Sequence, residues 1–280
     1  MVKITVNSEY FNTRDTLECG QIFRFYPVEQ NVYDVVSLDK VARVQTHEDK
    51  TEIICNETDQ AYFENFFDLK RDYSKIVDSA IKYGNQFLTE CATRGKGIRI
   101  LNQDIVETLF SFIISQNNNI PRIKGILERL CTALGEKKTF LDRQYFAFPS
   151  IKAMSSQPLE FYAKLGLGYR AQYVKKLADD INNGLDVATY NNLDTPALKK
   201  ALTNLYGVGP KVADCVCLFG YHRSDSFPVD TWIEKVYVQN FNGTLKDRNK
   251  ITAYFNQLFN ENAGYYQQYM FYFKRSLQNP

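Results

Sequence analysis

Two ionisable side chains, Lys211 and Asp230, have the types and the spacing that covalent chemistry at a sugar carbon requires. Lys211 follows Gly209-Pro210, a pattern that predicts the first turn of a helix. The positive end of a helix dipole disfavours a cation, and partial burial would act in the same direction, so we expect a neutral, nucleophilic amine. The alternative is a lysine that contacts a phosphate or is simply solvated.

Asp230 follows Phe227-Pro228-Val229 and precedes an apolar periodic stretch, so it is predicted to cap the N-terminus of the next helix. A capping carboxylate that accepts backbone N–H bonds stays ionised and fixed in place. Such a group can stabilise positive charge that develops on a sugar ring. Capping alone is the structural alternative, and the two roles are compatible.

The turn that positions Lys211 contains two glycines, Gly207 and Gly209, on either side of Val208. The spacing of leucines predicts a short helix over residues 197–205, and a second helix is expected to begin at Pro210. Glycine permits positive φ and close backbone approach, so the free N–H groups of this hairpin could bind a phosphate oxygen. An ordinary tight connection between two helices is the alternative for the glycines alone.

The wider pattern predicts an α+β protein with an antiparallel sheet first and a helical part after it. Short strands are expected within the first 57 residues, at 22–25, 32–36, 41–45 and 52–55, and helical periodicity begins near residue 59. Gly95-Lys96-Gly97 is a candidate connection. We therefore predict a sheet domain with flanking helices over 1–95 and a helical domain over 96–280.

Composition limits the classes of function. The 280 residues include 39 Tyr and Phe and have a net charge of only +2, but residues 101–280 carry 21 basic and 16 acidic side chains. The apolar runs are too short for a membrane span. Two histidines and six scattered cysteines make a zinc centre or a Ser-His-Asp triad improbable. Reduced thiols favour a cytoplasmic protein.

Four separated segments resemble the helix-hairpin-helix DNA glycosylases, and most closely the eukaryotic-type 8-oxoguanine DNA glycosylase/lyases that also occur in bacteria. They are the asparagine-rich segment 111–123, a wedge loop at 164–171, the lysine helix 211–218 and the carboxylate segment 227–230. The match is good over about residues 95 to 275 and thinner before them, where it depends on 19–24. No cysteine follows Cys217, which excludes the iron–sulfur cluster of some related enzymes.

The resemblance implies how DNA would be held. It assigns phosphate binding to Gly207, Gly209 and Val212, with an optional structural monovalent cation at the hairpin and no other cofactor. Asn117 would fill the space left by an extruded base, and Tyr169 would wedge beside the opposite cytosine. Arg122 and Arg170, with Asn117, would recognise the hydrogen-bonding edge of that cytosine.

The resemblance also implies the base pocket. 8-Oxoguanine has a proton on N7, where guanine has an acceptor, so a carbonyl of Gly20 would favour the oxidised base. Cys215 and Phe271 would sandwich the base, and Gln267 would bind its Watson–Crick edge, although a slip of one residue onto Gln268 is an alternative. The animal enzymes have a phosphate-binding histidine where this chain has Trp232, whose indole N–H can donate one hydrogen bond but adds no positive charge.

The implied reaction has two stages: Lys211 displaces the base and forms a Schiff base, with Asp230 stabilising the cationic sugar, and β-elimination then cuts the strand. No metal is required. The expected partner is double-stranded DNA that contains oxidised guanine, opposite cytosine by preference; we expect a monomeric, cytoplasmic bacterial protein that works at the nucleoid. The alternatives are a glycosylase of the same fold for another damaged base, a non-catalytic helix-hairpin-helix DNA-binding protein, and a scaffold with a decayed site.

Overall fold

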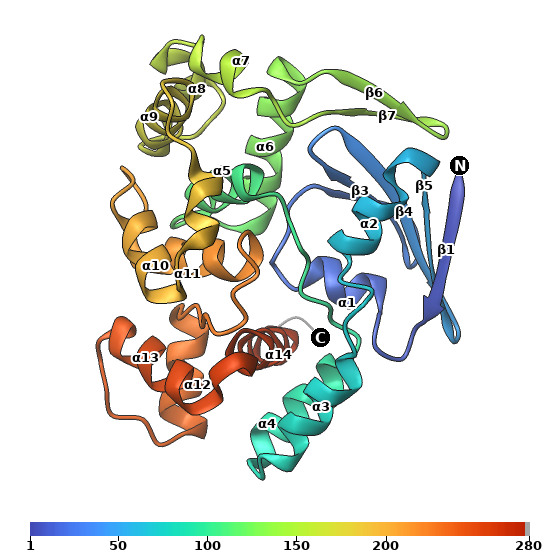
Figure 1. Cartoon of the computed structure of the whole chain (residues 1–280), viewed down its shortest axis with the longest axis vertical. Coiled ribbons are helices and arrows are strands. Elements are labelled where there is room, and N and C mark those ends of the chain that lie inside the picture. The colour runs from blue at the N-terminus through green and yellow to red at the C-terminus, as the bar shows by residue number, and fades with distance from the viewer. Residues whose placement is uncertain (278–280) are drawn as a thin grey trace.

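The computed structural model describes residues 1–277, and its N-terminal part is a five-stranded antiparallel sheet in the order β1-β5-β4-β3-β2. Figure 1 shows this sheet in blue beside the helical part of the molecule. The predicted strands at 32–36, 41–45 and 52–55 are confirmed. The bounds predicted for the strand at 22–25 are wrong, because β2 begins only at Phe25 and continues to Glu29. The strands are β1 (Val2–Asn7), β2 (Phe25–Glu29), β3 (Val32–Ser37), β4 (Lys40–His47) and β5 (Lys50–Cys55).

A second, two-stranded sheet interrupts the helical region and was not predicted. The hairpin β6 (Lys137–Phe140) and β7 (Arg143–Phe146) extends over the first sheet, as Figure 1 shows. Phe140 and Tyr145 pack there against Val36 and Val41. Alternation in this hairpin is short and highly charged, so the strand pattern is too weak to predict from sequence alone.

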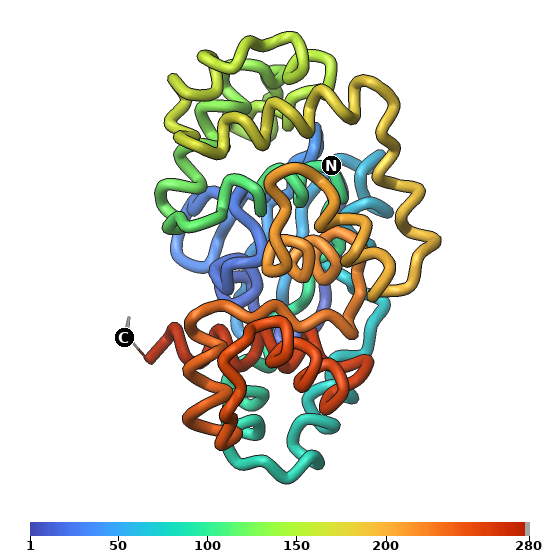
Figure 2. Tube along the Cα trace, turned by 90° about the vertical axis from the view of Figure 1, so that its left-hand side faces the viewer, coloured from blue at the N-terminus to red at the C-terminus, as the bar shows by residue number. Residues whose placement is uncertain are grey.

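The helical part contains most of the buried apolar side chains, which form one continuous core. Viewed from the side of α10, Figure 2 shows α7 to α9 in the upper part and α12 to α14 in the lower part. The helices are α1 (Thr13–Glu18), α2 (Gln60–Phe66), α3 (Tyr73–Lys82), α4 (Gln86–Gly95), α5 (Ile105–Ser115), α6 (Ile120–Leu134), α7 (Ile151–Ser155), α8 (Leu159–Lys164), α9 (Arg170–Asn182), α10 (Thr195–Thr203), α11 (Pro210–Phe219), α12 (Thr231–Asn240), α13 (Arg248–Phe259) and α14 (Ala263–Ser276).

A buried ion pair joins the sheet to the helical core. Arg24 Nη1 lies 2.9 Å from Glu107 Oε1 on α5, and the backbone N–H of Leu38 donates to Glu107 Oε2 at 2.7 Å. Arg24 also donates to the carbonyl of Phe146. Burial raises the pKa of Glu107, although Arg24 opposes this rise. The single carboxylate of Glu107 therefore accepts hydrogen bonds from both the Arg24 guanidinium and the Leu38 backbone.

Glu107→Ala is expected to lower the free energy of unfolding by about 3–5 kcal/mol, because it leaves the buried Arg24 without a counterion. Equilibrium urea unfolding measures the change. Glu90→Ala is the control, since Glu90 forms an exposed pair with Arg94 on α4 and should change stability by less than about 1 kcal/mol. Equal effects of the two substitutions would contradict a role of the buried pair in joining the two parts.

Among residues 1–277, no helix combines the length and apolar character needed to cross a bilayer. The same residues contain no cluster of three or more His, Cys, Asp and Glu side chains arranged to hold a metal ion. The division of the chain at residue 95 stays a prediction.

Candidate active site

Lys211 and Asp230 line one narrow pocket, although 18 residues separate them in the sequence. The cavity measures about 50 Å³, which has room for one or two water molecules but not for a purine. A base can therefore enter only if the walls move. The remaining lining residues come from α5, α11, α14, the segment after α1 and the segment before α12. They are Cys19, Gly20, Phe112, Cys215, Phe219, Pro228, Gln267, Gln268 and Phe271.

Lys211 lies in the first turn of α11, as predicted, but the residue is exposed, so the partial burial expected for it is wrong. Its Nζ is 5.5 Å from the centre of the Phe112 ring, which stacks on Phe219 at 5.5 Å with an interplanar angle of 12°. One turn further along α11, burial raises the pKa of Cys215 to about 11, even though Lys211 acts to lower it. The thiol therefore stays protonated near neutral pH and gives the pocket a neutral wall.

Asp230 caps α12, which confirms the structural part of its prediction. Its Oδ1 accepts hydrogen bonds from the N–H groups of Trp232 and Ile233, both at 2.9 Å. Among residues 1–277, no donor is found for Oδ2. The cap therefore fixes one carboxylate oxygen and leaves the second one available to the pocket.

The two adjacent glutamines of α14 have different surroundings. Gln268 Nε2 donates to the carbonyl of Cys19 at 2.7 Å and so holds the segment that precedes Gly20. Gln267 Nε2 donates to the carbonyl of Pro228 at 3.1 Å, whereas its Oε1 is buried without a partner in the described chain. A buried acceptor without a donor is costly unless a ligand provides one. This contrast favours Gln267 over Gln268 as the residue that binds a base.

Phe271 closes the pocket against Gly20. Gly20 has a φ of +90°, and a Cβ built on it would lie 3.3 Å from Phe271 Cε1. The ring thus lies in the space that a side chain at position 20 would need, close to the glycine, which accounts for the small cavity. Opening the pocket requires Phe271 to move away from Gly20.

The hairpin places Gly207 directly over an aromatic ring. Gly207 has a φ of +83°, and its carbonyl accepts a hydrogen bond from Gln116 Nε2 at 2.8 Å. A Cβ on this residue would lie 2.2 Å from Tyr173 Cγ on α9. Gly209, by contrast, has a φ of −86° and open space beside it. The structure therefore requires glycine at position 207 but not at position 209.

Gly207→Ala is expected to lower the free energy of unfolding by about 2–4 kcal/mol, because it combines a left-handed φ with a clash against Tyr173. Gly209→Ala should cost less than about 1 kcal/mol, because its backbone suits alanine. Thermal unfolding of both variants measures the difference. The steric explanation fails if the two variants unfold at the same temperature.

Two arginines support the predicted wedge loop and the asparagine-rich segment. Arg170 is only 3% exposed, and it donates to the carbonyls of Gln116 and Asn117, both at 2.7 Å. Arg122 Nη2 donates to the carbonyl of Gly166 at 3.2 Å. Contact of either arginine with a cytosine stays a prediction. For Arg170 it would require the guanidinium, which is now buried, to become accessible.

The side chains predicted to enter the DNA are presented at the surface. Asn117 has a φ of +46°, a left-handed conformation that projects it from the end of the α5 segment. Tyr169 is 50% exposed, and its ring lies 4.5 Å from the Arg170 guanidinium carbon. A rigid turn and a buried arginine thus hold both residues in place.

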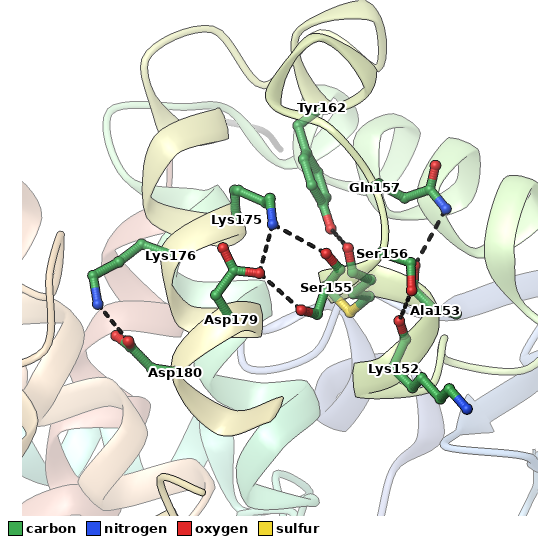
Figure 3. Close-up of polar contacts among 11 residues, drawn as sticks. Lys152, Ala153, Ser155, Ser156, Gln157, Tyr162, Lys175, Lys176, Asp179 and Asp180 are labelled. Atoms are coloured by element: carbon green, nitrogen blue, oxygen red, sulfur yellow. Dashed lines mark hydrogen bonds and ion pairs between the residues drawn. The ribbon is translucent and has the colours of Figure 1, made fainter. Parts of the chain in front are cut away.

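A polar network braces α9 behind the wedge loop (Figure 3). Lys175 Nζ donates to the carbonyl of Ser155 at 3.0 Å and to Asp179 Oδ1 at 2.5 Å, and Ser155 Oγ donates to the same carboxylate at 2.8 Å. Tyr162 OH donates to the carbonyl of Met154 at 2.6 Å. These contacts join helices α7, α8 and α9 to one another, and Tyr169 lies at the N-terminus of α9.

A wider groove of about 620 Å³ leads from the surface to Lys211 and Asp230. Asn117, Tyr169, Gly209 and Val212, all predicted to bind DNA, line it. The residues that the sequence did not reveal are Ser115, Gln116, Asn118, Pro210, Thr231 and Arg248. A hollow of about 700 Å³ lies elsewhere, around Thr195, Lys199 and Asp214, and Lys211 does not line it.

The sequence and the structure are similar to those of known repair enzymes. Residues 3–109 match the 8-oxoguanine DNA glycosylase N-terminal domain, and residues 110–261 match the HhH-GPD superfamily base excision DNA repair protein. The N-glycosylase/DNA lyase of Saccharomyces cerevisiae is 30% identical over 267 residues, which cover 85% of this chain and 70% of the relative.

Two solved structures superpose over almost the whole chain. One is MBOgg1 in complex with a low affinity DNA ligand, with a TM-score of 0.94, 35% identity, and 99% and 97% of the two chains covered. The other is the Clostridium acetobutylicum 8-oxoguanine glycosylase/lyase in complex with double-stranded DNA containing cytosine opposite to 8-oxoG. It has a TM-score of 0.92, 32% identity, and 99% of each chain covered.

Proposed function

Because this chain belongs to the HhH-GPD superfamily of base excision DNA repair proteins, we propose that it excises 8-oxoguanine from duplex DNA and then cleaves the strand. The observation that carries the proposal is the placement of Lys211 and Asp230 in one pocket with Gly20, Cys215, Gln267 and Phe271. An amine nucleophile, a carboxylate and a pocket for a flat base are the parts that a glycosylase/lyase needs.

The proposed chemistry begins with attack of the Lys211 amine on the anomeric carbon of an extruded nucleotide. The new C–N bond replaces the glycosidic bond, whose electrons leave with the base, and the base then takes a proton. The free oxygen of Asp230 stabilises the positive charge on the sugar. Opening of the sugar gives a Schiff base. β-Elimination then removes a proton from C2′, forms a C2′=C3′ double bond and breaks the bond between C3′ and its phosphate oxygen, which leaves as the phosphate.

Recognition of the oxidised base would use two acceptors in the pocket. The carbonyl of Gly20 is suited to the N7 proton that guanine lacks. The unpartnered Oε1 of Gln267 is suited to the donors on the Watson–Crick edge. An unmatched buried acceptor costs about 1–3 kcal/mol, so guanine would be disfavoured at Gly20.

Arg122→Ala is expected to reduce the preference for cytosine opposite the lesion about tenfold, because a planar arginine donates to base acceptors. Excision rates on duplexes with 8-oxoguanine opposite cytosine and opposite adenine measure this preference. Arg94→Ala on α4 is the control for loss of an exposed arginine. An unchanged ratio in Arg122→Ala would remove this residue from the recognition of cytosine.

The test of the proposed function is borohydride trapping on duplex DNA with 8-oxoguanine opposite cytosine, beside an undamaged duplex and an alkylated-base duplex. A covalent adduct with the oxidised lesion alone is expected. Binding to all three duplexes without an adduct would overturn the lyase mechanism, and a base-release assay would then separate a monofunctional glycosylase from a non-catalytic DNA-binding protein. A structural monovalent cation at the hairpin, a monomeric state and work at the nucleoid stay predictions.

A further inference from the structure

Trp232 lies in the groove that leads to the nucleophile, two residues after Asp230. The indole N–H can donate one hydrogen bond, but the side chain provides no charge for a phosphate. Trp232 is partly buried, and Lys235 Nζ lies 5.4 Å from the centre of its ring. The ring lies at the groove wall, where it presents an apolar surface.

Arg248, at the start of α13, lines the same groove as Trp232, Lys211 and Asp230. Glu234 Oε2 accepts from its Nε at 3.0 Å and from its Nη2 at 2.8 Å. In the part of the chain that the structure describes, Nη1 donates no hydrogen bond. Glu234 thus orients the guanidinium and leaves one nitrogen and its donors available to a ligand.

The charge around Arg248 favours an anionic ligand. The exposed segment 244–250 contains Lys246, Arg248 and Lys250 and a single acid, Asp247. The carboxylate of Asp247 caps α13 and accepts from the N–H groups of Asn249 and Lys250. The positive charges of this segment are therefore only partly balanced, and phosphate is an anion that arginine binds well.

We propose that Arg248 binds a backbone phosphate of the strand that carries the lesion, and that the Trp232 ring packs against the adjoining deoxyribose or base. The inference rests on the proposed function. The nucleotides next to the lesion reach the groove wall at Arg248 and Trp232 only if the extruded nucleotide is bound at Lys211 and Asp230. Arg248 then supplies the charge that Trp232 cannot supply, and Trp232 adds an apolar contact. Arginine for phosphate and an aromatic ring for a base or sugar is a common division of roles in DNA binding.

The test measures binding to a duplex with a tetrahydrofuran abasic-site analogue opposite cytosine, at a series of KCl concentrations. Arg248→Gln should weaken binding about tenfold at low salt and make the negative slope of log K against log[salt] shallower by about 0.9, the value for one phosphate contact. Arg248→Lys should keep the slope. Trp232→Leu should weaken binding about tenfold without changing the slope, and Trp232→Phe should keep most of the affinity.

Arg94→Gln is the matched control, because Arg94 also pairs with a glutamate on a helix but lies on α4, outside the groove. If Arg248→Gln keeps the wild-type slope, the phosphate contact is overturned. If Trp232→Leu binds as tightly as the wild-type protein, the packing contact is overturned. Binding to this duplex involves no bond cleavage, so the salt dependence can be measured even if the trapping experiment rejects the glycosylase/lyase function. Failure of the phosphate contact is therefore distinguishable from failure of the proposed function.

Discussion

Lys211→Gln is expected to abolish the borohydride-trapped adduct and to slow base release by a factor of about 10⁴. Glutamine is similar in length, so it can occupy the space beside Phe112 and Cys215, but its amide nitrogen is not a nucleophile. Loss of the attacking group removes the covalent route for both stages of the reaction. Single-turnover excision from a duplex with 8-oxoguanine opposite cytosine measures the effect.

The control for this experiment is Lys200→Gln, which removes an exposed lysine on α10. It should leave the adduct and the rate within about twofold of wild type, since surface changes far from a site have small effects. Binding of both variants to uncleaved duplex should persist. If Lys211→Gln released the base at the wild-type rate, the nucleophile would have to be another group or water.

Asp230→Asn is expected to slow base release by a factor of about 10³ while changing the free energy of unfolding by less than about 1 kcal/mol. The asparagine amide oxygen can still accept from the N–H groups of Trp232 and Ile233, so the cap survives. The negative charge beside the cationic sugar is lost. This substitution therefore separates the two roles that one side chain combines.

The matched control is Asp194→Asn, because Asp194 caps α10 by accepting from the N–H of Ala197 at 2.8 Å and has no place in the pocket. Both variants should unfold at nearly the wild-type temperature, and only Asp230→Asn should be slow. A normal excision rate in Asp230→Asn would show that this carboxylate has a capping role only.

The parts of the site that depend on local sequence could be predicted. A Gly-Pro-Lys run determines where a helix begins, and a Pro-Val-Asp run before an apolar stretch determines which residue caps the next helix. The predicted α+β fold, with its sheet before its helices, is confirmed. The β6–β7 hairpin was missed because its packing against the first sheet depends on Phe140 and Tyr145 meeting Val36 and Val41, about 100 residues away in the sequence.

The parts that depend on distant partners could not be predicted. Gln267 and Gln268 have the same side chain, and only the carbonyls that they meet, of Pro228 and Cys19, distinguish them. Burial of Arg170 is similar: the resemblance implied a base contact, but the fold brings three backbone carbonyls, of Gln116, Asn117 and Leu167, to its guanidinium. Arg248 lines the same groove as Trp232 and pairs with Glu234, 14 residues earlier in the chain, and neither relation is visible in the sequence.

The contact between Phe271 and Gly20 has a thermodynamic consequence. If the open pocket is a minor state, the apparent affinity for any base is the intrinsic affinity multiplied by the open fraction, so a 1% population weakens binding about 100-fold. For a base that diffuses freely in solution, the apparent affinity is reduced by this full factor. A base tethered to bound DNA is held near the pocket at a high effective concentration, on the order of millimolar for a short flexible tether, which compensates for much of it. The closed pocket would therefore make the protein a receptor for a base presented by duplex DNA, with little affinity for the same base alone.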